Sequence, residues 1–193
     1  TLVLHDWGCV FGYEFAMRHP DRVARIVGVD VGDFHSPALH ADLGPRGRWL
    51  TARYQLWLAA AWLLGRAGAT GVADRITRWQ ARVLRCPVPQ EALGWQMNYP
   101  YAMKWCGTSG GLRGLSPVAP ACPMLFVYGT RKYFDFHSQT WLAWLVARPG
   151  SAAVGLRAGH WLMLSQAEAF HAAVRTWLQG PDGATTPDRS PPG

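Results

Sequence analysis

The stretch Leu2-Val3-Leu4-His5-Asp6-Trp7-Gly8, with the helical pattern that follows it over residues 9–17, decides the fold of this chain. A short apolar strand ends in a polar triplet, Gly8 permits a sharp turn, and a helix begins at once. Asp6 stands at this corner, between the strand and the helix. A carboxylate is ionised near neutral pH, so it can open a strained or polarised C–O or C–halogen bond without first losing a proton. The alternative interpretation is that Asp6 caps the N-terminus of the helix.

The segment His5-Asp6-Trp7-Gly8 resembles the nucleophile elbow of α/β-hydrolases, in particular that of epoxide hydrolases and haloalkane dehalogenases. The likeness continues into the helix, where Gly12 lets the helix pack closely on the strand. It departs at Leu4, where many family members carry a glycine, so the turn must accommodate a larger side chain. The resemblance implies a parallel-sheet α/β-hydrolase fold with Asp6 as the nucleophile.

The composition is that of one globular domain with a sizeable core, since 49% of the 193 residues are hydrophobic. No apolar run is long enough to span a membrane. The formal charge of +7 comes from scattered arginines, without a basic cluster in a recognisable nucleic-acid motif. The cysteines lack metal-binding spacing and are predicted to be buried thiols of a reducing compartment: Cys9, Cys86, Cys106 and Cys122. We therefore expect a cytoplasmic protein with no cofactor, no metal and no nucleic-acid partner.

Short apolar runs alternate with helical patterns along the chain, which predicts a parallel sheet. Strands are predicted over residues 2–4, 23–29, 124–128 and 152–156. Helices are predicted over residues 9–17, 49–65, 72–84, from 90 onward, 138–147 and 167–178, with loops at 44–47 and 107–120. The helical stretch 34–117 resembles the cap domain of the family, and residues 1–33 and 118–179 form a partial core. Residues 180–193 are rich in Pro, Gly, Asp, Thr and Ser, which predicts a disordered tail.

The resemblance covers only the part of the fold from the elbow strand onward. Family members draw part of the oxyanion hole from a loop after an earlier strand, and the sequence holds no His-Gly loop of that kind. We therefore expect the chain to be a fragment of a hydrolase, inactive and poorly soluble when expressed alone, because its first strand would be an unpaired edge.

A histidine is needed after ester formation, because cleavage of an ester on Asp6 requires water and a base. The resemblance points to His160, in the Gly159-His160-Trp161 loop after the last predicted strand. A loop histidine is also commonly a plain surface residue. The other histidines fit less well, and His5 is expected to point away from Asp6.

The base in turn needs a carboxylate that fixes its tautomer and stabilises its charge. Many family members carry this acid after the strand predicted at 124–128, where this chain has Lys132. Some haloalkane dehalogenases carry it after the preceding strand, where Asp30 stands. We predict Asp30 as the acid, with Asp135 second and Asp33 third; a loop-capping carboxylate is the alternative for Asp30.

The leaving group distinguishes the two chemistries. An epoxide oxygen needs a proton, and the resemblance makes Tyr101 and Tyr99 candidate donors, with Tyr54 a further one, although cap tyrosines commonly only pack. A halide needs N–H donors, for which several tryptophans are available: Trp7, Trp49, Trp57, Trp62, Trp95 and Trp105. Trp7 is a donor in either branch, to the leaving group or to the oxyanion.

These observations predict a hydrolase that acts on a small apolar molecule through an alkyl-enzyme ester, with epoxides as substrates. Haloalkane dehalogenation is the alternative chemistry. A reading from another class is an inactive pseudo-hydrolase that serves only as an interaction module, which Lys132 and the absent oxyanion loop favour.

Overall fold

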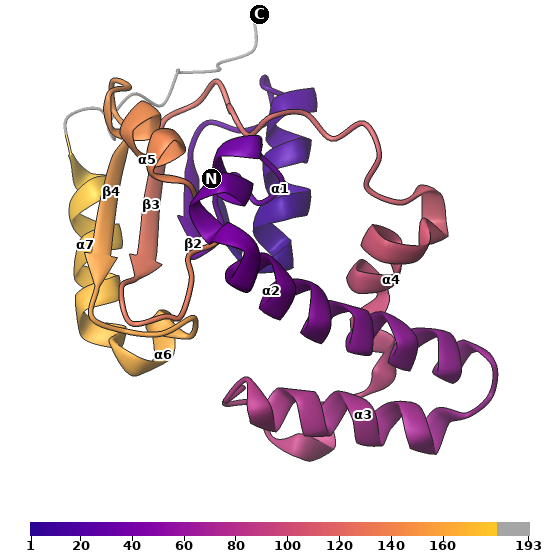
Figure 1. Cartoon of the computed structure of the whole chain (residues 1–193). Coiled ribbons are helices and arrows are strands. Elements are labelled where there is room, and N and C mark those ends of the chain that lie inside the picture. Colours follow the sequence, from indigo (N-terminus) through magenta and orange to yellow (C-terminus); the bar gives the residue numbers. More distant parts are fainter. Residues whose placement is uncertain (181–193) are drawn as a thin grey trace, which may run out of the picture. The chain divides into compact units, whose positions relative to one another are not determined.

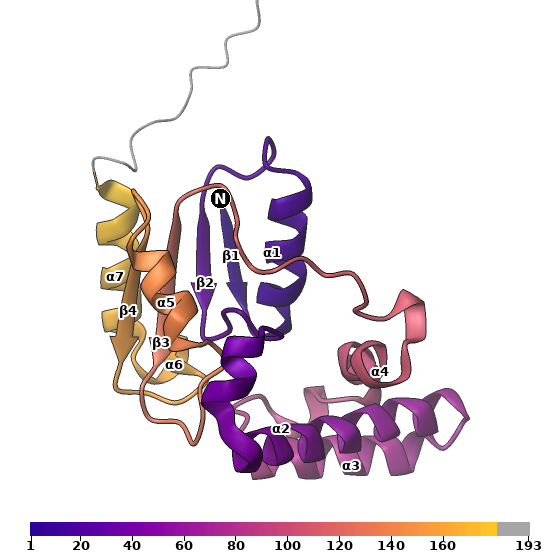
Figure 2. The ribbon, with the colours of Figure 1, turned by 45° about the horizontal axis from the view of Figure 1, so that its top comes forward.

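The computed structural model describes residues 1–180, so the tail predicted over 180–193 lies outside the described residues except for Gly180. Four strands form one parallel sheet in the order β1-β2-β3-β4, as Figures 1 and 2 show. Their bounds are β1 Leu2–His5, β2 Ile26–Val29, β3 Met124–Gly129 and β4 Ala152–Leu156. The predicted parallel sheet is confirmed.

Helices fill the connections between the strands. They are α1 Trp7–Arg18, α2 Pro37–Arg66, α3 Thr70–Val83, α4 Tyr99–Cys106, α5 Gln139–Val146, α6 Leu162–Ser165 and α7 Ala167–Gln179. Short 3₁₀ helices lie at η1 Gln90–Ala92, η2 Trp95–Asn98 and η3 Thr108–Gly110. Across residues 1–180, none of these helices combines the length and the hydropathy that crossing a membrane requires.

Two prolines, Pro45 and Pro100, lie at the start of helical segments. The loop predicted at 44–47 lies inside α2, where only Gly44 leaves the helical conformation (φ 60°, ψ 179°) and Pro45 opens the next turn. Pro100 lies in the first turn of α4. Proline is tolerated there because the first N–H groups of a helix have no partner within the helix. Ser138 caps the N-terminus of α5, since its Oγ accepts a hydrogen bond from the Trp141 N–H at 3.0 Å.

Side chains of the central strands alternate between the two faces of the sheet. On one face they pack with α6 and α7 in a cluster of buried residues: Val27, Val29, Leu125, Val127, Ala158, Leu162 and Phe170. On the other face, Tyr13 of α1 lies against Gly28, and Trp141 of α5 meets Phe126 at 5.0 Å between ring centroids. Helices thus cover both faces, and the carboxyl ends of the strands carry the loops that hold the predicted site residues.

Leu4, which stands where many members of the resembled family carry a glycine, is accommodated by a glycine in α1. A Cβ added at Gly12 would lie 2.4 Å from Leu4 Cδ1, well inside contact distance. Leu4 therefore occupies the space that a side chain at position 12 would need. The elbow accommodates the larger residue on the strand because the helix has no side chain opposite it.

The described residues divide into two compact units, residues 1–42 with 117–180 and residues 43–116. The second unit, the helical unit, contains most of α2, α3, α4 and the 3₁₀ helices. Within it Trp95 of η2 packs on Gly65 of α2, and the Trp95 N–H donates to Asp74 Oδ1 of α3 at 2.9 Å. The rings of Trp57 and Trp79 join α2 and α3 edge to face, with centroids 6.4 Å apart.

Candidate active site

The corner between β1 and α1 is strained at Asp6. Its backbone has φ 52° and ψ −126°, and its side chain makes no capping hydrogen bond to α1. Within residues 1–180 only four non-glycine residues have positive φ, and Asp6 and Asp30 are two of them. Strained backbone of this kind concentrates at functional sites. The Asp6 side chain is 42% exposed, so its carboxylate is neither a helix cap nor part of the core.

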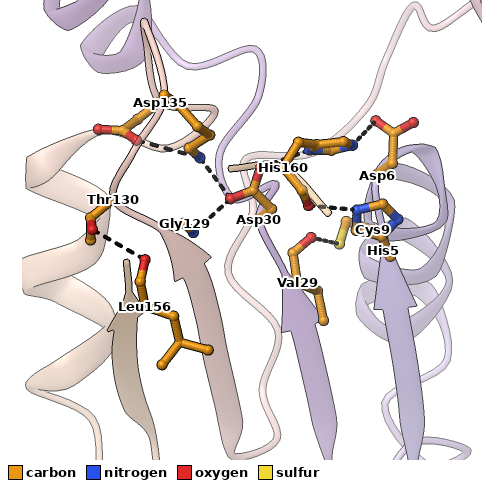
Figure 3. Close-up of polar contacts among 11 residues, drawn as sticks. His5, Asp6, Cys9, Val29, Asp30, Gly129, Thr130, Asp135, Leu156 and His160 are labelled. Atoms are coloured by element: carbon orange, nitrogen blue, oxygen red, sulfur yellow. Dashed lines mark hydrogen bonds and ion pairs between the residues drawn. The ribbon is translucent and has the colours of Figure 1, made fainter. Parts of the chain in front are cut away.

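Asp30 lies directly after β2 and is fully buried. Its backbone turns sharply with φ 67°, and the Val31 N–H donates to the Val29 carbonyl across it at 2.9 Å. The carboxylate is completely engaged. Oδ2 lies 2.7 Å from His160 Nδ1, while Oδ1 accepts from the Gly129 N–H at 2.9 Å and from Lys132 Nζ at 2.7 Å (Figure 3).

His160 reaches Asp30 because its loop crosses the end of β3. The Arg131 N–H donates to the Ala158 carbonyl at 2.9 Å, which ties this loop to the segment after β3. A Cβ added at Gly129 would lie 2.4 Å from the Gly159 carbonyl oxygen, so only glycine allows the crossing at this distance. The loop after the edge strand β4 thereby carries its imidazole to the end of β2.

The three side chains form a line of carboxylate, imidazole and carboxylate. His160 Nε2 lies 3.8 Å from Asp6 Oδ1, and Nδ1 lies 2.7 Å from Asp30 Oδ2 (Figure 3). An ionised carboxylate can only accept, so Nδ1 must donate to Asp30 and a neutral imidazole has its lone pair at Nε2, on the side of Asp6. This is the arrangement of a base that is oriented by one acid and faces another.

Asp30 is ionised in this arrangement. Burial alone raises the pKa of Asp30, but the hydrogen bond from His160 and the charge of Lys132 outweigh it and lower that pKa below its usual value. The two lower-ranked acids make other contacts. Asp135 Oδ1 lies 3.4 Å from Lys132 Nζ. Asp33 accepts from the Ser138 N–H and Oγ, both at 2.7 Å, and fixes the start of α5.

His5, which is expected from the sequence to point away from Asp6, lies against His160. The two ring centroids are 4.5 Å apart, and His5 Nε2 lies 3.2 Å from the His160 carbonyl oxygen (Figure 3). Burial and the neighbouring His160 lower the pKa of His5, so its ring is neutral at neutral pH. The only sequence signal was its place as the last residue of a parallel strand, beside the nucleophile.

Cys9 is the other potential nucleophile near Asp6, and its environment excludes that role. It is fully buried, donates from Sγ to the Val29 carbonyl at 3.5 Å, and burial raises the pKa of its thiol to about 12. A nucleophilic cysteine must be a thiolate. The four cysteines are free, but only Cys9 matches the prediction of fully buried thiols.

Comparisons of sequence find short matches to known proteins, and no protein-family model matches. One match is to a cis-3-alkyl-4-alkyloxetan-2-one decarboxylase of Shewanella oneidensis, 49% identical over 37 residues. Another is to a haloalkane dehalogenase of Mycolicibacterium smegmatis, 60% identical over 30 residues. These segments make up 19% and 16% of this chain and only 12% and 10% of the two relatives.

Comparison of structures covers nearly the whole chain. A variant of an epoxide hydrolase from Bacillus megaterium, solved with its diol product, superposes over 93% of this chain and 69% of its own, with a TM-score of 0.62 and 17% identity. The same enzyme bound to an inhibitor gives a TM-score of 0.56. This chain is an α/β-hydrolase-fold protein. The predicted partial α/β-hydrolase fold is thereby confirmed.

The residues that are predicted to donate a proton or a hydrogen bond in catalysis lie in both compact units. Trp7 is the first residue of α1, and its ring stacks with Phe11 at 6.2 Å between centroids. Tyr99 and Tyr101 lie in α4 of the helical unit. The rings of Tyr101 and Tyr54 meet edge to face, with centroids 6.1 Å apart. The roles of these residues as proton or hydrogen-bond donors remain predictions.

The burial of His137 is expected to make the stability of the fold depend on pH. It is 1% exposed, and within residues 1–180 neither of its ring nitrogens has a hydrogen-bond partner. Burial lowers the pKa of His137. The folded state therefore holds the neutral ring, and the unfolded state takes up a proton below about pH 6.5. The free energy of unfolding then falls as pH falls below that value.

Replacing His137 by phenylalanine is expected to reduce this pH dependence. Each such histidine contributes a slope of at most about 1.4 kcal/mol per pH unit, and His5 keeps a slope of the same sign. Urea unfolding of wild type and variant at pH 7.5 and 5.5 measures the difference. The exposed His171, replaced in the same way, should leave the dependence unchanged. An equal loss of stability on acidification in wild type and His137→Phe would contradict the assignment.

Proposed function

We propose that this chain is a hydrolase that opens epoxides through a covalent ester on Asp6, which water activated by His160 then cleaves. The observation that carries the proposal is the line formed by Asp6, His160 and Asp30, with atom separations of 3.8 Å and 2.7 Å. The strained backbone at Asp6 and its uncapped side chain support the same role.

In the first step an Asp6 carboxylate oxygen attacks an epoxide carbon, and the bond from that carbon to the ring oxygen breaks. The electron pair goes to the ring oxygen, which takes a proton from a donor. Tyr101 and Tyr99 are our proposed donors, because a phenol is a suitable acid for an alkoxide leaving group. The product of this step is an ester between Asp6 and the opened substrate.

In the second step His160 Nε2 takes a proton from water, and the water oxygen attacks the ester carbonyl carbon of Asp6. Asp30 stabilises the resulting imidazolium. The backbone N–H of Trp7, at the start of α1, is our proposed donor to the oxyanion. The imidazolium then returns its proton to the departing alkoxide. This releases the diol and leaves Asp6 as a carboxylic acid with one oxygen from water. The carboxylic acid proton then returns to the phenolate of the tyrosine that acted in the first step, which regenerates the Asp6 carboxylate.

Haloalkane dehalogenation is the second candidate, and one observation favours it. The carboxylate that contacts His160 follows β2, where some haloalkane dehalogenases carry their acid, and not β3. The first step is then displacement of a halide by Asp6, with no proton needed, and the second step is the same. The names of the two curated relatives describe action on a haloalkane and on a four-membered cyclic ester, which supports a carboxylate that attacks a polarised or strained bond.

The His160→Gln variant is expected to trap the ester. The first step does not use His160, whereas the second step needs it as the base, so the substrate stays attached to Asp6. Intact-protein mass spectrometry after incubation with styrene oxide should show an added mass equal to the whole epoxide, and peptide mapping should place it on Asp6. Incubation with 1-bromohexane should instead add the hexyl group if the chain is a dehalogenase. If neither compound forms an adduct, the result would favour the interpretation that the chain is an inactive interaction module.

A further inference from the structure

Lys132 occupies the position after β3 where the family resemblance leads one to expect an acid, and its side chain is 8% exposed. Its Nζ lies 2.7 Å from Asp30 Oδ1 and 3.4 Å from Asp135 Oδ1. It also lies 5.7 Å from the Phe136 ring centroid. The lysine therefore touches the opposite oxygen of the carboxylate that holds His160, and it reaches the site only through Asp30.

The charges around Asp30 explain the role of the Lys132 ammonium group. A fully buried carboxylate is costly unless a positive charge or several hydrogen bonds compensate it. If His160 were the sole compensating group, the pair would favour the imidazolium, because an unprotonated imidazole leaves Asp30 without a counter-charge. A base that must accept a proton from water has to be neutral before it acts. Lys132 supplies a positive charge that does not depend on the state of His160.

We propose that Lys132 is a positioning residue that serves as the permanent counter-charge of Asp30, so that the ionised Asp30 can hold His160 through Nδ1 without requiring a proton on Nε2. The proposal deepens the proposed function and rests on it for its catalytic meaning, while the charge relation itself can be measured without substrate. The other titratable groups facing this cluster are His5 and Asp6 beside His160, and Asp135 and His137 on the segment after β3.

The test is an NMR titration of the His160 imidazole in the whole chain, with its signals assigned by their loss in His160→Gln. In Lys132→Met the imidazole should become protonated at higher pH than in wild type, by roughly one pH unit, the size of effect that a neighbouring charge exerts in a protein. Lys132→Arg keeps the charge and should restore the wild-type titration. Arg131→Met removes an exposed cation next in sequence and should change nothing.

Asp135→Asn provides a test of opposite sign that does not disturb the buried carboxylate. It leaves Lys132 entirely to Asp30 and removes a negative charge, so His160 should become protonated at the same or a lower pH. This partly exposed position also serves if Lys132→Met does not fold. A titration in folded Lys132→Met that coincides with wild type, or an upward shift in Asp135→Asn, would overturn the proposal. A shift as expected in a chain that forms no ester with any substrate would support the counter-charge role and refute the proposed function instead.

Discussion

Replacing Asp6 by alanine is expected to lower turnover by about 10⁴-fold or more, the scale seen when a nucleophile is removed from a catalytic constellation. Without the carboxylate no ester forms, and His160 has no intermediate on which to direct water. The loss should reside in kcat, because Asp6 makes the bond in the reaction and is only one small part of the surface that meets the substrate. Steady-state kinetics with styrene oxide and with 1-bromohexane measure the effect.

The matched control is Asp6→Gly, which should be equally inactive yet no less stable than wild type. The Asp6 side chain makes no cap bond to α1, and its positive φ is a conformation that glycine adopts without strain. A backbone outlier of this kind costs on the order of 1–3 kcal/mol, part of which glycine recovers. Thermal unfolding followed by circular dichroism gives the comparison. Turnover by either variant at the wild-type rate would remove Asp6 as the nucleophile.

The strands could be predicted from the sequence wherever proline or glycine flanks an apolar run. β3 begins directly after Pro123 and ends at Gly129, one residue beyond the predicted range 124–128, and β4 covers the predicted range 152–156. β2 begins at Ile26 and not at Val23, although Val23 is 4% exposed. Hydrophobicity marks burial, whereas a strand also needs a partner, and the pairing of β2 with β1 and β3 begins at Ile26.

The candidate site was less accessible to sequence reasoning, because it depends on which segments meet above the sheet. The resemblance to epoxide hydrolases and haloalkane dehalogenases makes Asp6, Asp30 and His160 the candidates, and in the structure the carboxyl ends of the parallel strands share one edge of the sheet. The order of the strands does not give the path of the loop after β4, which carries His160. The contact of His5 with that loop joins residues 155 positions apart, and it follows from the crossing at Gly129. No local sequence pattern indicates that this loop crosses the end of β3.

Asn in place of Asp30 is expected to reduce turnover by about 10⁴-fold, as an Asp→Asn change does in a serine-protease triad, whereas Asn in place of Asp135 should cost no more than a few-fold. An amide at position 30 can donate as well as accept, so it no longer fixes the proton of His160 on Nδ1, and it cannot stabilise the imidazolium. Asp135 contacts Lys132 and is 42% exposed, so its charge is largely screened by solvent.

Mass spectrometry separates this role from that of Asp6. The Asp30→Asn variant should still form the ester and should accumulate it, because only the water step needs an oriented base, while Asp6→Ala should show no adduct at all. Asp33→Asn offers a structural control: it weakens the start of α5, so its effect should appear in stability and leave the accumulation of ester unchanged. If Asp135→Asn accumulates ester and Asp30→Asn turns over normally, the acid lies after β3, and the contact between Asp30 and His160 serves only the fold.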